Sequence, residues 1–143
     1  MRIYLPILIL IADALFLSGC TTHKKDPRFH ETLAIQQIGI IQSAQTQYYS
    51  QFGKYAQNLA ELGPPHSGAA GPSAADFIPG DISQGKKAGY VFTLQRSPTG
   101  YTITAVPEAF GKTGRRTFYS DQTLVMRQNW TAEPPTATSP ELM

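Results

Sequence analysis

GYVFTLQRSPTGYTITAV, residues 89–106, has an alternating hydrophobic pattern on both sides of a turn. Large or apolar side chains fall at every second position, at Tyr90, Phe92 and Leu94 and then at Tyr101, Ile103 and Ala105. A period of two is typical of a strand with one buried face. The residues between the two halves, Ser97-Pro98-Thr99-Gly100, favour a tight turn. The stretch therefore predicts a β-hairpin.

A second pair of strands is predicted after the hairpin, beyond the loop Gly111-Lys112-Thr113-Gly114. Residues 116–120 and 123–127 form the strands, and Asp121-Gln122 between them forms the turn. From Asn129 onward the chain is rich in proline, threonine and serine. This composition predicts a disordered tail over residues 129–143.

The residues before the hairpin have a helical period. Between about residues 28 and 52, apolar side chains form one broad face, made by Leu33, Ile40, Ile41, Ala44, Tyr48 and Phe52, with Ala34 and Ile38 on its shoulder. Polar side chains fall on the opposite face, at Thr32, Gln36, Ser43, Thr46 and Ser50. The stretch also contains six glutamines, each of which would need a partner in hydrocarbon. We therefore expect a helix that lies on the sheet and not a membrane pass.

Turn and cap signals separate this helix from the hairpin. Gly53 suits the left-handed position that ends a helix, and Asn58 suits the cap of a short turn over 59–62. Residues 63–75 have the composition of a flexible loop, and 76–83 of a further short helix or turn. The sequence thus predicts one α+β domain over residues 29–128, with an N-terminal helix packed on a three- to four-stranded antiparallel sheet.

An apolar run at the N-terminus ends in Leu17-Ser18-Gly19-Cys20, which contains the only cysteine of the chain. Arg2 and the apolar residues 3–17 have the order of a secretory signal. The segment resembles a bacterial lipoprotein signal over residues 1–19, cut between Gly19 and Cys20. Cys20 would then carry acyl chains, because a thiol accepts a thioether-linked diacylglycerol. Asp13 departs from the pattern, since a carboxylate costs about 3 kcal/mol at the centre of an inserted helix.

Two other interpretations of the apolar run are weaker. An uncleaved anchor helix needs about 20 apolar residues, and this run is shorter and is interrupted by Pro6 and Asp13. An ordinary secretory signal would release a lone free thiol into an oxidising compartment, which is unusual. Residues 20–28 would be the lipidated N-terminus and its polar tether. Because Thr21 and not aspartate follows the cysteine, the resemblance implies the outer membrane, facing the periplasm, with the inner membrane or the cell surface as alternatives.

The end of the predicted helix resembles the corresponding region of type IV pilins and pseudopilins. The resemblance rests on the spacing of Tyr48-Tyr49, of Phe52-Gly53-Lys54-Tyr55, and of Leu59 and Leu62. It extends to the strands, in residues 89–93, 101–105 and 116–123, and covers roughly residues 29–128. It implies a pilin-like head.

The chain departs from true pilins at its N-terminus. Gly19 is followed by Cys20, Lys24 stands where pilins have a glutamate, and residues 21–28 are polar. The apolar half of the pilin helix, which forms the filament core, is absent from these positions. We therefore expect a pilin-like head joined to a lipid anchor, which does not polymerise as pilins do.

Residue patterns for catalysis or metal binding are weak in this sequence. The histidines His23, His30 and His66 lack the spacing of a zinc-binding helix, and Gly111-Lys112-Thr113 lacks the rest of a phosphate-binding loop. We therefore expect no catalytic residue, metal or cofactor. The net charge of +2 does not favour nucleic acid. Because some pseudopilins bind calcium near their C-terminal loops, the resemblance also points to Asp121 and loop 107–114, with a hairpin turn as the alternative role of Asp121.

The function expected from these features is a non-enzymatic interaction or accessory role in the cell envelope. By resemblance, the partner is a type IV pilus or type II secretion assembly, contacted through a free sheet edge or the loop after the helix. The alternative is a periplasmic small-ligand or carbohydrate-binding module formed by loops 63–88 and 107–115. A hydrolase is a third hypothesis, and the sequence leaves the oligomeric state open.

Overall fold

The structure, a computed structural model, describes residues 26–143. The predicted signal peptide, its cleavage site at Gly19 and Cys20, and most of the tether lie outside these residues. Within the described part of the chain, no helix is both long and apolar enough to cross a membrane.

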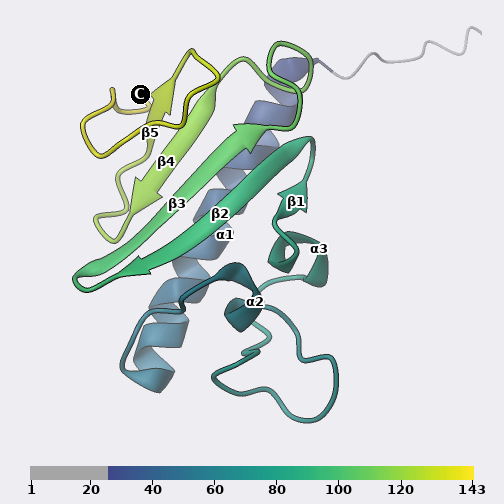
Figure 1. The fold of residues 1–143 in the computed structure, drawn as a ribbon, viewed down its shortest axis with the longest axis vertical. Helices are drawn as coiled ribbons and strands as arrows, with labels where there is room; N and C mark the ends of the chain where they lie inside the picture. The colour runs from purple at the N-terminus through teal and green to yellow at the C-terminus, as the bar shows by residue number, and fades with distance from the viewer. Residues whose placement is uncertain (1–25) are drawn as a thin grey trace, which may run out of the picture.

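One long helix, α1 (Pro27–Phe52), lies against one face of a five-stranded antiparallel sheet (Figure 1). The strands follow one another in chain order across the sheet: β1 (Lys86–Lys87), β2 (Tyr90–Ser97), β3 (Gly100–Pro107), β4 (Thr117–Asp121) and β5 (Arg127–Asn129). Two single-turn helices, α2 (Leu59–Leu62) and α3 (Gly80–Ser83), connect α1 to the sheet. The predicted α+β class and the helix on an antiparallel sheet are confirmed, but the sheet has five strands where three or four were expected.

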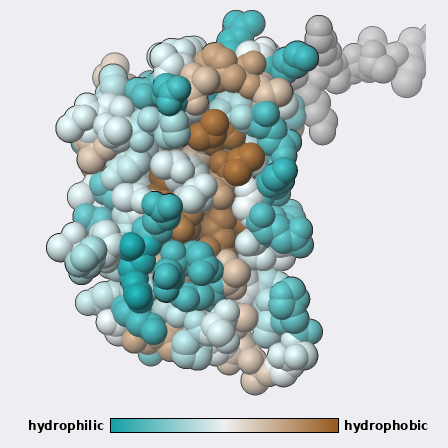
Figure 2. Space-filling view, viewed as in Figure 1, coloured by the Kyte–Doolittle hydropathy of each residue, from teal (hydrophilic) through white to brown (hydrophobic). Residues whose placement is uncertain are grey.

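The predicted hairpin forms the centre of the sheet. β2 and β3 pair along their whole length, from Tyr90 opposite Pro107 to Ser97 opposite Gly100. Alternate side chains of β2 are buried as the period of two predicted, and the other set faces the open side of the sheet. On that open side Val91 lies opposite Val106, and Figure 2 shows hydrophobic surface over β2 and β3 there.

The strand missed by the sequence is β1, which is only two residues long and too short to show a period. Positive φ angles at Ala88 (54°) and Gly89 (76°) turn the chain from β1 into β2. The second pair of strands also differs from expectation, because β5 begins at Arg127 and not at Thr123. Residues between β4 and β5 form a wide turn, in which Leu124 has a φ of 65°.

Helix α1 begins and ends at the positions that the sequence indicated. The carboxylate of Asp26 accepts a hydrogen bond from Arg28 N at 2.9 Å, and Pro27 occupies the first turn, where its missing N–H costs nothing. Gly53 ends the helix at a φ of 68°, and its N–H bonds to Tyr49 O. A residue with a Cβ would be strained in that conformation.

The buried stripe of α1 is rotated relative to the prediction. Ala34 and Ile38, which were placed on the shoulder, are fully buried with Ile41 and Tyr48, whereas Ile40 is exposed. The sheet therefore lies over the shoulder of the predicted apolar face. The predicted polar face is confirmed, because its five members are all exposed: Thr32, Gln36, Ser43, Thr46 and Ser50.

The C-terminal residues are packed against the sheet, so the prediction of a disordered tail over 129–143 is wrong. Thr117 on β4 donates its hydroxyl to Glu133 O at 2.9 Å, and Leu142 N donates to Met126 O at 2.8 Å. Thr117 and Tyr119 alternate with Phe118, and all three are buried. Both faces of β4 therefore need a cover, and the tail supplies the outer one.

Candidate functional site

The predicted lipidation residue, Cys20, and the cleavage residue Gly19 lie outside the described residues, so both remain predictions. The first described residue, Asp26, is only six positions after Cys20 and lies at the start of α1. This places the start of α1 closest along the chain to the predicted anchor. The same end of the head contains the one buried ion pair found among the described residues.

Glu31 is 3% exposed on the first turns of α1 and is enclosed by the chain that enters β4. Its Oε2 accepts a hydrogen bond from Arg116 Nε at 2.8 Å, and its Oε1 accepts one from Arg115 N at 2.8 Å. Both carboxylate oxygens are therefore satisfied, as a buried charge requires. The pair joins the start of the helix to the start of the strand.

Sequence reasoning missed this pair, although one signal was present. Glu31 shares a helix face with Ala34 and Ile38, at spacings of three and seven residues, and is the last acid before a long uncharged stretch. An acid on the buried face of a helix needs a cation in the same place. Nothing in the sequence identifies Arg116 as that cation.

Three further side chains contact the guanidinium of Arg116. Its centre lies 5.3 Å from the ring of Trp130 and 5.4 Å from the ring of Phe118, and its Nη1 donates to Gln128 Oε1 at 2.9 Å. Such cation–π contacts orient the ring as well as the guanidinium. Trp130 is nevertheless 67% exposed.

An open pocket of about 450 Å³ lies beside this cluster, lined by Asp26, Pro27, Arg28, Glu31, Arg115, Arg116 and Trp130. Its two carboxylates are already used, since Asp26 caps the helix and Glu31 is paired with Arg116. The pocket therefore presents basic side chains and one aromatic ring. This surface suits an anionic group and does not supply the acid and base of a hydrolase.

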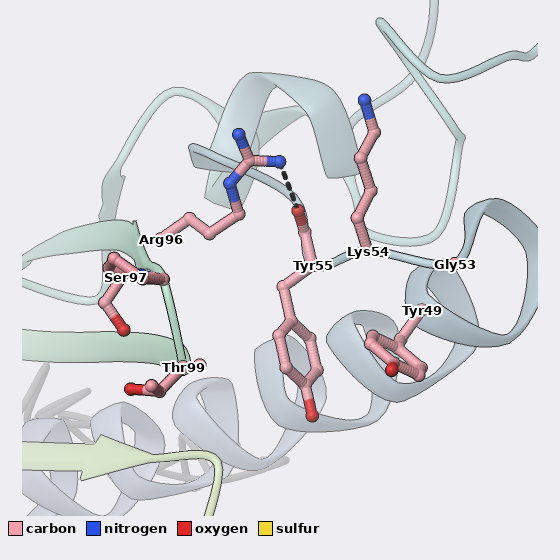
Figure 3. A pocket seen from close by; sticks show the side chains of 9 residues that line it. Tyr49, Gly53, Lys54, Tyr55, Arg96, Ser97 and Thr99 are labelled. Carbon is pink, nitrogen blue, oxygen red and sulfur yellow. Dashed lines mark hydrogen bonds between the residues drawn. The ribbon is translucent and has the colours of Figure 1, made fainter.

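A second open pocket, of about 540 Å³, lies at the opposite end, between the end of α1 and the tip of the β2–β3 hairpin (Figure 3). Tyr55 packs between Tyr49 and Tyr101, with ring centroids 4.7 and 4.9 Å away. Arg96 Nη1 donates to Tyr55 O at 3.3 Å. These contacts account for the aromatic spacing after α1 in structural terms, because they attach the loop to the hairpin.

The outer edge of β2 is only partly covered. β1 pairs with Tyr90 and Val91, and residues 93–97 have no strand partner on that side within the described chain. A shallow groove of about 280 Å³ runs beside this edge, lined by Asn58, Leu59, Ala60, Ser83, Gln84, Gly85, Phe92, Thr93 and Leu94. This is the free sheet edge of the described fold.

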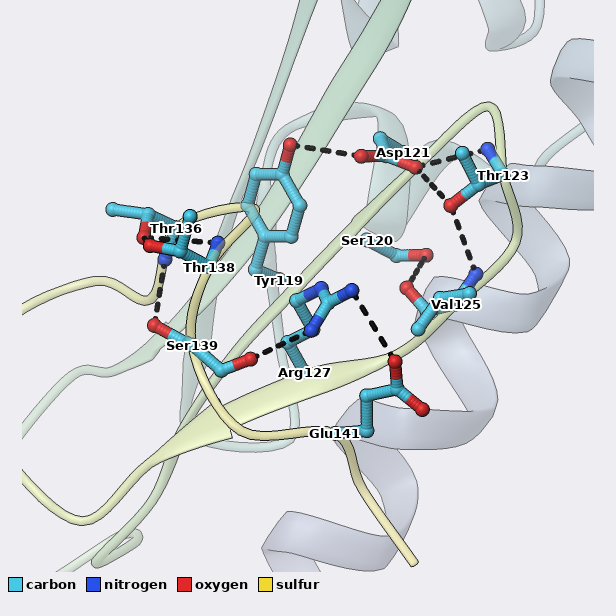
Figure 4. Close-up of polar contacts among 10 residues, drawn as sticks. All are labelled: Tyr119, Ser120, Asp121, Thr123, Val125, Arg127, Thr136, Thr138, Ser139 and Glu141. Atoms are coloured by element: carbon cyan, nitrogen blue, oxygen red, sulfur yellow. Dashed lines mark hydrogen bonds and ion pairs between the residues drawn. The ribbon is translucent and has the colours of Figure 1, made fainter.

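Asp121 is a turn residue. Its Oδ1 accepts hydrogen bonds from Thr123 N and Oγ1 at 2.9 and 2.6 Å, and its Oδ2 accepts one from Tyr119 Oη at 3.1 Å (Figure 4). Burial would raise the pKa of Asp121, but these hydrogen bonds outweigh it and lower the pKa below its ordinary value. Loop 107–114 lies at the other end of the sheet (Figure 1). The two parts of the suggested calcium site are therefore not together, and the described residues contain no cluster of three or more potential metal ligands.

Among the remaining polar candidates, His30 and Thr113 have structural partners. His30 Nδ1 lies 2.7 Å from Ala88 O, His66 lies on the exposed loop after α2, and His23 is outside the described residues. Thr113 closes its own loop through Ala109, whose N–H and carbonyl both bond to the threonine hydroxyl. The Gly-Lys-Thr sequence is thus a closed turn before a strand.

Burial favours the neutral form of two tyrosines of the core, Tyr90 and Tyr101. Burial, more than any charge, raises the pKa of Tyr90 well above its ordinary value and that of Tyr101 to about 12. The hydroxyl of Tyr90 donates to Arg116 O at 2.8 Å. Tyr90 is therefore a hydrogen-bond donor of the core, and the raised pKa values make both tyrosines poor candidates for a base.

Comparison with known proteins identifies no relative of the chain: no protein family, no curated protein and no solved structure matches it.

Proposed function

We propose that the chain is a lipid-anchored protein of the bacterial cell envelope whose pilin-like head has a non-enzymatic, accessory role. The observation that carries the proposal is Leu17-Ser18-Gly19-Cys20, a lipoprotein-type signal directly before an α+β head. Only six positions separate Cys20 from the first described residue, so the anchor and the head belong to one short-tethered unit.

Three carboxylates of the head favour a role in binding over one in catalysis. Glu31 neutralises Arg116, Asp26 caps α1 and Asp121 closes a turn, so each of these carboxylates is engaged in structure. A general acid or base must instead be free to exchange a proton with a substrate.

The partner we propose is a protein of a type IV pilus or type II secretion assembly, by resemblance of the head to pilins. The contact surface is the free edge of β2, residues 93–97. A partner strand can add there through main-chain hydrogen bonds, which depend little on the side chains of either protein. Arg96 is exposed on this edge, whereas the adjacent Lys86 and Lys87 are paired with Glu108 and Asp81.

Mass spectrometry of the membrane fraction tests the anchor, with wild type compared with Cys20→Ala. The expected result is a mature chain that begins at Cys20 with a diacylglycerol and a further acyl chain. The Cys20→Ala chain should remain unprocessed and carry none. Cleavage elsewhere, or an unmodified wild-type chain, would refute the anchor.

Site-specific photocrosslinking in cells tests the partner surface. A crosslinking residue at Gln95, on the free edge, should capture pilus or secretion components. The same residue at Ser50, which is exposed on the outer face of α1, is the matched control and should not. Equal capture from both positions, or none from Gln95, would contradict the edge as the contact.

The alternative, a small-ligand or carbohydrate-binding module, requires a different location from the one expected. Most of loop 63–88 lies at the opposite end of the sheet from loop 107–115 (Figure 1), so the two loops do not close around one ligand. The hairpin-tip pocket suits this alternative better, because Tyr49 is half exposed there beside Lys54 and Arg96. Saturation-transfer NMR with a panel of sugars tests it, and signals that survive Tyr49→Ala would exclude the pocket.

A further inference from the structure

We propose that the end of the head at which α1 begins docks on the lipid bilayer. The docking surface consists of three exposed aromatic side chains and three basic ones: Phe29, Phe110, Trp130, Arg28, Lys112 and Arg115. We call this set the bilayer-facing surface. The inference rests on the anchor at Cys20 proposed above and adds the orientation in which the anchor holds the head.

The aromatic members come from three separate segments that meet at this end. Phe29 is on the first turn of α1, and Trp130 lines the same pocket as Pro27 and Arg28. Phe110 is in the loop between β3 and β4, which reaches the start of α1 (Figure 1). A Cβ added at Gly89 would touch both Thr113 of that loop and His30 of α1, which shows how close the two segments are.

These aromatic side chains are unusually accessible. Trp130 and Phe29, at 67% and 55%, are the most exposed aromatic residues in the described chain, and Phe110 is 42% exposed. Aromatic side chains are enriched at the boundary between lipid and water, where an apolar ring meets polar headgroups. The contact with Arg116 holds the indole of Trp130 in place, so the ring is presented without the entropic cost of ordering it on contact.

The charges at this end favour an anionic lipid surface. Arg28, Lys112 and Arg115 are exposed, and Lys24 and Lys25 immediately precede the described residues in the sequence. Against these five cations, Asp26 and Glu133 are the exposed acids of this end for which residues 26–143 contain no ion-pair partner. Glu31 is paired with Arg116, and Glu108 lies 3.7 Å from Lys86. Clusters of lysine and arginine next to a membrane anchor attract anionic headgroups.

The bilayer is the partner that we propose for this surface, because the tether between Cys20 and α1 is short. Six residues separate Cys20 from Asp26, and a fully extended chain spans at most about 3.6 Å per residue. The start of α1 therefore stays within about 22 Å of the anchored cysteine. A surface held so close meets the membrane at a high effective concentration, so weak aromatic and basic contacts suffice to dock it.

Trp130 provides a direct test, because it is the only tryptophan in the chain. The full lipidated protein is purified in detergent and reconstituted into vesicles of phosphatidylcholine with phosphatidylglycerol, with and without brominated phosphatidylcholine. The expected result is quenching of Trp130 emission by the brominated lipid, a shift of its emission to shorter wavelength, and at least threefold protection from acrylamide relative to the protein in urea-denatured form.

Matched variants distinguish specific docking through the bilayer-facing surface from nonspecific hydrophobic adsorption to the vesicles. Phe29→Ser with Phe110→Ser should reduce quenching by brominated lipid at least twofold. Tyr49→Ser with Leu124→Ser removes two exposed side chains remote from the start of α1 and should leave quenching unchanged. Circular dichroism of each variant confirms that it is folded before it is compared. Equal loss in both pairs, or no loss in the first, would overturn the assignment of the surface.

The outcomes distinguish this inference from the anchor on which it rests. A lipidated protein whose Trp130 is untouched by brominated lipid and open to acrylamide would overturn docking and leave the anchor intact. If mass analysis shows no acyl chains, the anchor fails, and the Cys20→Ala chain mixed with the same vesicles decides the rest. Quenching of Trp130 in that mixture would support docking without an anchor, and its absence would overturn docking as well.

Discussion

The buried pair of Glu31 and Arg116 leads to the sharpest prediction about stability. In Glu31→Gln the side chain keeps its size and can still accept the hydrogen bond from Arg115 N, but the charge that faces the guanidinium is lost. Breaking a buried ion pair from one side costs about 3 to 5 kcal/mol, because the remaining charge stays buried without a partner. The side chain of Arg116 is 20% exposed and keeps Gln128 and two aromatic rings, so we expect the lower end, about 3 kcal/mol.

Urea denaturation measures this loss, followed by circular dichroism and by the emission of Trp130, which lies on the same cluster. For a domain of this size the expected loss corresponds to a fall in Tm of about 10 °C. Glu141→Gln is the matched control, because Glu141 also pairs with an arginine, Arg127 at 3.3 Å, but its side chain is 62% exposed. That substitution should cost less than about 1 kcal/mol.

Two further observations would strengthen or refute the reasoning. The loss in Glu31→Gln should change little between low salt and about 0.5 M salt, since a buried pair is poorly screened. Glu31→Leu combined with Arg116→Met should recover much of the loss, because neither charge is then left alone. A cost for Glu31→Gln no larger than that for Glu141→Gln would show that Glu31 is not enclosed as described.

Three more predictions concern other parts of the head. Gly114→Ala should destabilise the fold by about 1 to 3 kcal/mol in urea denaturation, because the new Cβ would collide with the ring and hydroxyl of Tyr90; an unchanged midpoint would contradict this close approach. Asp121→Asn should cost about 1 kcal/mol at pH 7 through weakened hydrogen bonds from Thr123. Because the pKa of Asp121 is lowered, its contribution to the free energy of unfolding is present above pH 3.8 and is lost as the pH falls further. The difference in the free energy of unfolding between wild type and Asp121→Asn should therefore disappear at low pH. A difference that stays constant down to about pH 2 would refute this. The pKa of Tyr101 is raised from 10.0 to about 12, so its contribution to stability is complete below pH 10 and is lost as the pH rises through 12. The difference in absorbance at 295 nm between wild type and Tyr101→Phe should therefore show the tyrosinate of Tyr101 forming together with unfolding and not before it.

The elements that the sequence predicted correctly are those with long periodic patterns and local ends. Helix α1 and the β2–β3 hairpin depend on neighbours within a few residues, and their caps and turns, such as Gly53, are local as well. The rotation of the buried stripe of α1 from Ile40 toward Ala34 and Ile38 is a tertiary effect. It depends on where the sheet lies, which no pattern inside the helix determines.

The features that the sequence did not predict have a common physical cause, because each depends on contact between distant segments of the chain. Glu31 and Arg116 are 85 positions apart, and only the fold brings them together. The tail of residues 129–143 is polar and rich in proline, yet it is ordered by β4, which needs cover on both faces. The run Thr117 to Ser120 lacks a clear alternation of apolar and polar residues, which is typical of a strand buried on both sides, and that was the available signal.

The length of helix α1 also determines how far the opposite end of the head lies from the bilayer. Its 26 residues, at 1.5 Å each, extend about 39 Å, and it runs along the long axis of the head (Figure 1). With its first turn on the bilayer, the helix would act as a rigid spacer that carries the hairpin tip and the loop after α2 to roughly that height. A partner confined to the same bilayer would then be too far away to contact those loops, whereas a filament or strand that extends into the periplasm would contact them directly.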